Sequence, residues 1–126
     1  MSLLAFICLS AVAIDGDTLR CANSTQTIRL AGIDAPELAG HCRKTRVCAP
    51  GDAIAARDYV TGALALGPVT IQPIKIDLYG RLVASATIAT GENLSCSILI
   101  AGHAIPKPNW DSGRTTRNTC PQAFGS

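Results

Sequence analysis

Four acidic side chains stand close together in the first third of the chain. Asp15 and Asp17 flank a glycine in the segment Ile-Asp-Gly-Asp-Thr, and Asp34 and Glu37 close a second segment that is interrupted by Pro36. An Asp-Gly pair between β-prone residues predicts a tight hairpin turn, and a proline cannot donate to a β-ladder. Hairpin pairing would bring the two segments together. Because neighbouring carboxylates repel, such a cluster is typical of a site that holds a divalent cation.

Together with two arginines, these residues are of the types that phosphodiester hydrolysis needs. That reaction requires an activated water, neutralised phosphoryl oxygens and an aligned attack. Asp17 and Asp34 are hard oxygen ligands suited to Ca²⁺. Glu37 would act on the water as a general base. Arg29 and Arg81 would bind the phosphate from two sides, because a guanidinium offers a planar donor fork that matches two phosphate oxygens.

Each residue also has a purely structural interpretation. Asp17 could be only a turn residue, and Glu37 could be a solvent-facing side chain after a proline. The two arginines could lie on the surface in ion pairs, and Asp77, four positions before Arg81, would then be its partner. Convergence of the whole set in space is what would favour catalysis.

Three ordered motifs resemble the staphylococcal nuclease (thermonuclease) family. They are I-D-G-D-T at 14–18, I-R-L-A-G-I-D-A-P-E at 28–37 and D-L-Y-G-R at 77–81, within a resemblance that runs from about residue 7 to residue 106. Five short strands with a helix after the third fit an α+β, mainly β fold, a five-stranded OB-fold barrel with two helices, and the resemblance implies the same barrel. The family usually carries a third, C-terminal helix, but residues 107–126 do not look like one. The resemblance also implies a Ca²⁺-dependent endonuclease that cleaves DNA and RNA with low sequence specificity. Water attack would be assisted by Glu37 and would leave 3′-phosphate products.

The resemblance implies further contacts around this site. The backbone carbonyl of Ala35 would be a third metal ligand beside Asp17 and Asp34; the family more often has threonine there. Tyr79 would contact the nucleotide, either by stacking on a base or by hydrogen bonding to a phosphate. Lys75 would follow the polyanion backbone.

Composition sets limits on these interpretations. At 126 residues the chain is most simply one domain, 1–126, with a core at about 5–106 and an irregular tail at 107–126. A net charge of +2 is too small to indicate a nucleic-acid binder by itself, and only 4% aromatic residues argue against stacked aromatic platforms. The basic groups would have to be concentrated locally, as in the run Arg43, Lys44 and Arg46, which could equally be a solvated loop.

Six cysteines in so short a chain indicate disulfides and an oxidising compartment, so we expect a secreted or periplasmic protein. Six cysteines allow about 15 pairings. The favoured pairs are Cys42 with Cys48, Cys8 with Cys21 and Cys96 with Cys120. A zinc site of His41, Cys42 and Cys48 is the alternative, although the close cysteine pairs typical of structural zinc sites are missing.

The expected elements follow from turn signals and apolar spacing. Strands are expected at 5–14, 18–23, 26–33, 69–76 and 82–89. Asp52 should cap a helix that ends at a left-handed Gly67, and Asn93 should cap a second helix at 94–101. The tail from 107 shows no helical period. An N-terminal leader is absent or ambiguous, and the apolar N-terminal run is too short to cross a membrane.

Three functions remain to be compared. The leading hypothesis is the nuclease, a monomer with DNA and RNA as substrate and no membrane partner. A non-catalytic OB-fold module that binds nucleic acid would use the same barrel. A disulfide-stapled scaffold that binds another protein is the third. Neither alternative needs the combination of acidic and arginine residues.

Overall fold

The computed structural model describes residues 4–125, so the ends of the predicted 1–126 domain lie outside the described part. The strands are β1 (Phe6–Ile7), β2 (Val12–Asp15), β3 (Thr18–Arg20), β4 (Ile28–Leu30), β5 (Ile33–Asp34), β6 (Thr70–Ile76), β7 (Leu82–Thr87) and β8 (Ile105–Pro106). The α-helices are α1 (Ala53–Leu64), α2 (Leu94–Ile100) and α3 (Thr115–Thr119). Short 3₁₀ turns cover Pro108–Trp110, Ser112–Arg114 and Pro121–Phe124.

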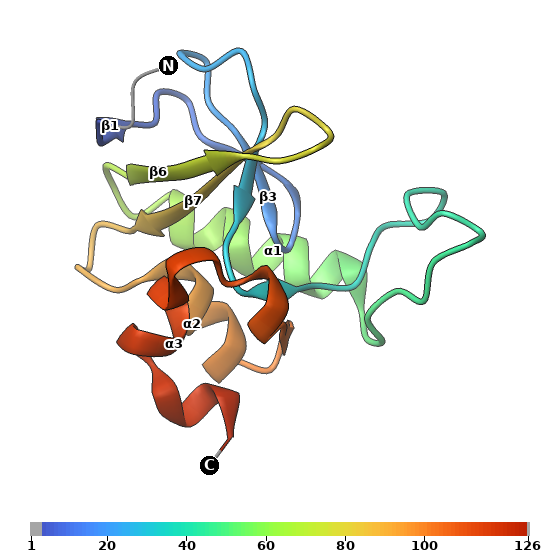
Figure 1. The fold of residues 1–126 in the computed structure, drawn as a ribbon. Helices are drawn as coiled ribbons and strands as arrows, with labels where there is room; N and C mark the ends of the chain where they lie inside the picture. Colours follow the sequence, from blue (N-terminus) through green and yellow to red (C-terminus); the bar gives the residue numbers. More distant parts are fainter. Residues whose placement is uncertain (1–3, 126) are drawn as a thin grey trace.

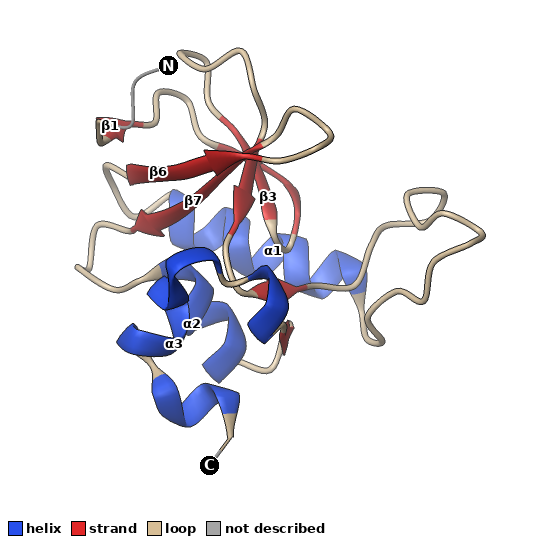
Figure 2. Cartoon of the chain, viewed as in Figure 1, coloured by secondary structure: helices blue, strands red, loops and turns tan. Residues whose placement is uncertain are grey.

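Six strands form one sheet in the order β1-β6-β7-β4-β3-β2. Figures 1 and 2 show that this sheet is curled. The β4–β7 pair is parallel and the other pairs are antiparallel. Strands β5 and β8 form a separate two-stranded ladder. Helix α1 packs against β2, and α2 lies beside α3 (Figure 1). The predicted α+β, mainly β fold of the OB type is therefore confirmed.

Two of the five predicted strands are each broken into two. Residues 5–14 contain β1 and β2, because Ser10 adopts a left-handed conformation (φ 49°) and turns the chain between them. Residues 26–33 contain β4 and the start of β5, separated at Gly32 (φ 81°). The breaks let β1 pair with β6 and let β5 leave the sheet to pair with β8. A period-two pattern alone does not locate such corners.

Helix α1 begins where the sequence predicted and ends earlier. The Asp52 carboxylate accepts a hydrogen bond from the Ala55 N–H (3.0 Å), as an N-cap should. The C-cap is Ala65 in the right-handed region, so the expected left-handed cap at Gly67 is wrong. Gly67 (φ 149°) instead allows a close approach, since a Cβ there would lie 2.9 Å from the Ala89 Cβ.

The second helix matches its prediction closely. It spans Leu94–Ile100, and the Asn93 side chain accepts from the Cys96 N–H at 3.0 Å. None of the described helices combines the length and the apolar character that a membrane crossing requires.

The tail is more regular than the sequence indicated. Helix α3 lies within residues predicted to be irregular, so the expectation of only two helices is wrong. The Thr116 Oγ1 donates to the Ala31 carbonyl (2.8 Å), and the Asp111 carboxylate accepts from the Thr116 N–H (2.9 Å). The Cys96–Cys120 disulfide joins the end of α3 to α2. Because β-branched threonines are weak helix formers, tertiary contacts hold this short helix.

The corner at Gly32 should be intolerant of a side chain. A Cβ there would lie 2.9 Å from the Thr116 Cβ and 3.1 Å from the Asp111 Cγ, at a φ that L-residues avoid. We expect Gly32→Ala to lower the free energy of unfolding by about 3 kcal/mol. Gly62→Ala is the matched control, because Gly62 lies in α1 with open space around it; it should stabilise by about 0.5–1 kcal/mol. Urea denaturation measures both, and equal effects would contradict the packing argument.

Candidate active site

Most of the predicted site residues face one cleft of about 840 Å³. They come from the β2–β3 turn, from β4, from the segment after β5, from β6 and from the β6–β7 turn. The predicted residues that line the cleft are Asp17, Arg29, Glu37, Lys75, Tyr79 and Arg81. The other two, Asp34 and Ala35, are buried; they do not line the cleft but contact the lining residues Arg29 and Asp17.

The two predicted metal-binding aspartates come together at one guanidinium. Asp17 and Asp34 are buried, with 4% and 1% of their surface exposed. The Arg29 Nη2 lies 3.4 Å from the Asp17 Oδ2 and 4.0 Å from the Asp34 Oδ1. The Asp17 Oδ2 also accepts a hydrogen bond from the Ala35 N–H (2.8 Å), so the Ala35 backbone is adjacent. The hairpin turn and the end of β5 therefore meet, as the sequence predicted.

Arg29 is a buried charge that also binds the chain itself. Its Nη1 donates to the Leu30 carbonyl (3.0 Å) and its Nη2 to the Ile33 carbonyl (2.9 Å). Burial lowers the pKa of Arg29 below its ordinary value, against the opposing effect of Asp17. An arginine stays protonated despite such a shift. Its guanidinium thus fixes the corner between β4 and β5 while still lining the cleft.

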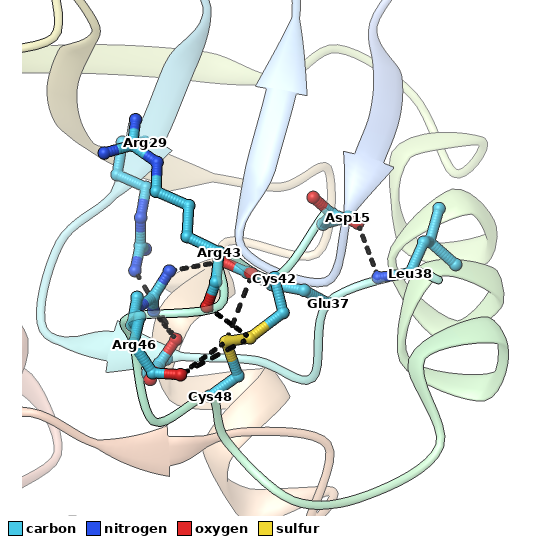
Figure 3. Close-up of a disulfide and its surroundings, with 9 residues drawn as sticks. Asp15, Arg29, Glu37, Leu38, Cys42, Arg43, Arg46 and Cys48 are labelled. Carbon is cyan, nitrogen blue, oxygen red and sulfur yellow. Dashed lines mark hydrogen bonds and ion pairs between the residues drawn. A yellow bond between two sulfur atoms is a disulfide. The ribbon is translucent and has the colours of Figure 1, made fainter. Parts of the chain in front are cut away.

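Glu37 is held in an ion pair that the sequence did not predict. Arg46 Nη1 donates to the Glu37 Oε1 (Figure 3). Arg46 Nη2 donates to the Asp34 Oδ1 at 3.0 Å. Burial alone would lower the pKa of Arg46, but the charges of Glu37 and Asp34 prevail and raise it. The loop sequence contains three basic residues, Arg43, Lys44 and Arg46. Nothing in that sequence indicates which of them pairs with the acidic segment.

Arg81 reaches the same cleft and already has a carboxylate partner. Its Nε donates to the Asp77 Oδ2 at 2.7 Å, so the ion pair considered from the sequence is present. Tyr79 is 65% exposed and lies beneath two guanidinium groups, with the Arg81 Cζ 5.4 Å and the Arg43 Cζ 4.7 Å from the ring centroid. Lys75 is exposed on β6 at the cleft edge.

A family model described as "Staphylococcal nuclease homologue" matches residues 27–123. The chain belongs to the staphylococcal nuclease family. A protein of Schizosaccharomyces pombe described as a probable endonuclease is 42% identical over 62 residues, which cover 49% of this chain. The chain spans 25% of that relative's length. The family match begins after the Asp15–Asp17 turn. The assignment of this turn to the site therefore depends on its own sequence motif and on its geometry.

All three predicted disulfides of this nuclease-family chain are confirmed: Cys8–Cys21, Cys42–Cys48 and Cys96–Cys120. The zinc alternative is wrong, because Cys42 and Cys48 are bonded to each other and cannot act as thiolate ligands. His41 lies instead against the Asp15 carboxylate, with its Nδ1 3.3 Å from Oδ1.

Trp110 is a cleft residue to which the sequence assigned no role. It is 37% exposed and lies in the 3₁₀ turn Pro108–Trp110. Three cations lie over its ring: Arg29, Arg46 and Lys107, at 5.4, 5.5 and 5.2 Å from the centroid. The ring's electron-rich face attracts these cations, so Trp110 packs the basic groups together on this wall of the cleft. No local motif marks it.

Removing Asp77, the ion-pair partner of Arg81, should lower the free energy of unfolding by an amount that depends on pH. Burial would raise the pKa of Asp77, but hydrogen bonds from Arg81 and Tyr79 outweigh it and hold the pKa below its ordinary value. The ionised Asp77 therefore makes its full contribution to the free energy of unfolding above about pH 4, the unfolded-state pKa. That contribution is lost as pH falls below this value. We expect Asp77→Asn to cost about 1–2 kcal/mol at pH 7, and the difference from the unmodified protein to shrink below about pH 4.

Thermal denaturation between pH 3 and pH 8 checks this dependence. Asp58→Asn is the control, because the Asp58 side chain is 68% exposed on α1. A cost that stayed constant down to pH 3 would count against the role of the Asp77 charge.

Proposed function

We propose that this chain is a Ca²⁺-dependent nuclease that hydrolyses phosphodiester bonds in DNA and RNA with low sequence specificity. The observation that carries the proposal is the convergence of Asp17, Glu37 and Arg29 at one cleft, with the buried Asp34 linked to them by the contacts of two guanidinium groups. Family membership and the probable endonuclease among its relatives support nucleic acid as the substrate.

The residues present fit a hard divalent cation. Two buried carboxylates come within 4.0 Å of one positively charged nitrogen, and oxygen donors of this kind suit Ca²⁺. Asp17 and Asp34 would hold the ion, together with the carbonyl of Ala35, whose backbone already contacts Asp17. When bound, the ion would neutralise the charge that builds on the phosphoryl oxygens.

The chain's own side chains would then perform the remaining steps. Glu37 would position a water and accept its proton. Arg29 and Arg81 would bind phosphate oxygens with charge-assisted hydrogen bonds that strengthen as charge develops. Arg81 would exchange Asp77 for the phosphate. The water oxygen would bond to phosphorus as the bond from phosphorus to the 5′ oxygen breaks. The departing 5′ oxygen would take up a proton from solvent and leave a 3′-phosphate, the outcome that the family resemblance implies.

Low sequence specificity follows from the kinds of contact available. Arginine and lysine contacts to phosphate position a strand without reading its bases. Lys75 and Tyr79 at the edge of the cleft would add a phosphate contact and a stacking surface that accepts every base. None of these contacts needs a particular sugar, so both DNA and RNA would be substrates.

Glu37→Gln should abolish cleavage and leave binding intact. The amide keeps the shape of the side chain but cannot accept the proton, so we expect hydrolysis of single-stranded DNA with Ca²⁺ to fall by about 10² to 10⁴-fold. Glu92→Gln is the control, since Glu92 lies outside the cleft and is the chain's other glutamate. The oxidised protein is assayed with Ca²⁺ and with chelator, and strand binding is measured in parallel.

Full cleavage by Glu37→Gln would contradict the assigned role. Binding of the strand without cleavage by the unmodified protein under any divalent cation would favour the non-catalytic OB-fold module.

Ca²⁺ and a nucleoside bisphosphate should stabilise the protein jointly. Each ligand completes the other's site, so the rise in melting temperature with both should exceed the sum of the separate rises. A ligand present at about 100 times its Kd adds about 2.7 kcal/mol to the free energy of unfolding. Asp34→Asn should lose this joint effect relative to its own ligand-free melting temperature, whereas Asp58→Asn should keep it. A protein-binding scaffold would show no shift with either ligand.

A further inference from the structure

The loop closed by the Cys42–Cys48 disulfide projects away from the sheet, in the blue-green part of Figure 1. Its residues 42–45 and 47 are exposed, but Arg46 is only partly so, because its side chain turns back to the barrel. The guanidinium contacts two carboxylates, Asp34 and Glu37, that come from different points of the acidic segment. One loop residue thus bridges two groups of the proposed site (Figure 3).

The loop holds Arg46 in this position. The Arg46 N–H donates to the Arg43 carbonyl at 3.0 Å. The Arg46 carbonyl oxygen lies 3.7 Å from the Cys42 Sγ and 3.9 Å from the Cys48 Sγ, so its backbone packs against the disulfide. The Cys48 Sγ also lies 3.5 Å from the Glu37 Oε2. The disulfide therefore restricts how far the guanidinium can move from Glu37 and Asp34.

The position matters because of what Asp34 is expected to bind. The Asp34 Oδ1 already accepts from the Arg46 Nη2 at 3.0 Å, and its side chain is 2% exposed. A cation held by the same carboxylate would meet a positive charge at hydrogen-bonding distance from it. Like charges so close in a partly buried site repel strongly.

We propose that Arg46 is an internal competitor of the divalent cation: it occupies Asp34 and Glu37 in the ligand-free protein and must leave Asp34 when the cation binds. This inference rests on the proposed function, because it takes Asp34 to be a cation ligand. Arg46 would then lower the affinity for the cation and keep Glu37 paired until the ion arrives. The Trp110 ring, 5.5 Å from the Arg46 Cζ, offers the displaced guanidinium a surface on which to remain.

Calorimetric titration of Ca²⁺ into the oxidised protein, without nucleotide, tests the competition. Arg46→Ala should bind Ca²⁺ about tenfold more tightly than the unmodified protein, because the ion no longer has to break a charge-assisted pair. Arg43→Ala is the matched control: Arg43 has the same charge, lies in the same loop and lines the same cleft, but stacks on Tyr79. It should change the affinity by less than about threefold.

Arg46→Lys is a second variant that keeps the charge and loses the planar fork. Its Ca²⁺ affinity should lie between those of the unmodified protein and Arg46→Ala. Circular dichroism of each variant confirms that it is folded. An unchanged or weaker Ca²⁺ affinity in Arg46→Ala would overturn the inference, and so would an increase of equal size in Arg43→Ala. The cleavage assay on the unmodified protein is independent of this result, so a protein that cleaves DNA while Arg46→Ala binds Ca²⁺ no more tightly would refute the competition alone.

Discussion

The buried guanidinium of Arg29 is the interaction on which the site depends. A charge with 8% of its surface exposed is costly unless it is fully paired. Arg29 meets that requirement with Asp17 and with the carbonyls of Leu30 and Ile33. Those partners come from the β2–β3 turn and from both sides of the corner between β4 and β5. Fixing one cation in this position therefore also fixes the carboxylates that surround it, before any ligand is present.

The tail stabilises the same corner from outside. The Gly32 N–H donates to the Trp110 carbonyl at 3.1 Å, and the Lys107 N–H donates to the Gly32 carbonyl at 2.8 Å. Thr116 and Ser95 both donate to the Ala31 carbonyl, and the Cys96–Cys120 disulfide keeps α3 in place. Trp110, which belongs to the tail, also contacts Arg29 through its ring. The tail is therefore in direct contact with the site. The segment predicted to be irregular is thus part of the wall of the cleft.

Local signals predicted much of this arrangement, and long-range contacts account for what they missed. The Asp-Gly turn, the Asp52 cap, the Asn93 cap and the Cys42–Cys48 pair each depend on a few neighbouring residues, and each is confirmed in the fold. The Cys8–Cys21 and Cys96–Cys120 pairs span 13 and 24 positions and are also confirmed. The two partners of Arg46 lie 9 and 12 positions away on the barrel. The place of Trp110 and helix α3 depend on residues much farther away in the chain. A sequence pattern cannot specify which of three basic residues in a loop turns inward, since that choice is made by carboxylates on the barrel.

The pairing of charges also explains how a chain of small net charge could bind a polyanion. Each arginine of the cleft's centre has a carboxylate partner: Arg29 has Asp17, Arg81 has Asp77, and Arg46 has Asp34 and Glu37. The long-range field is therefore weak, in keeping with a formal charge of +2. Binding must be gained by exchanging these partners inside the cleft, where burial strengthens each contact. Such a site would select for a ligand that supplies both a cation and a phosphate, because either one alone leaves an arginine or a carboxylate without its partner.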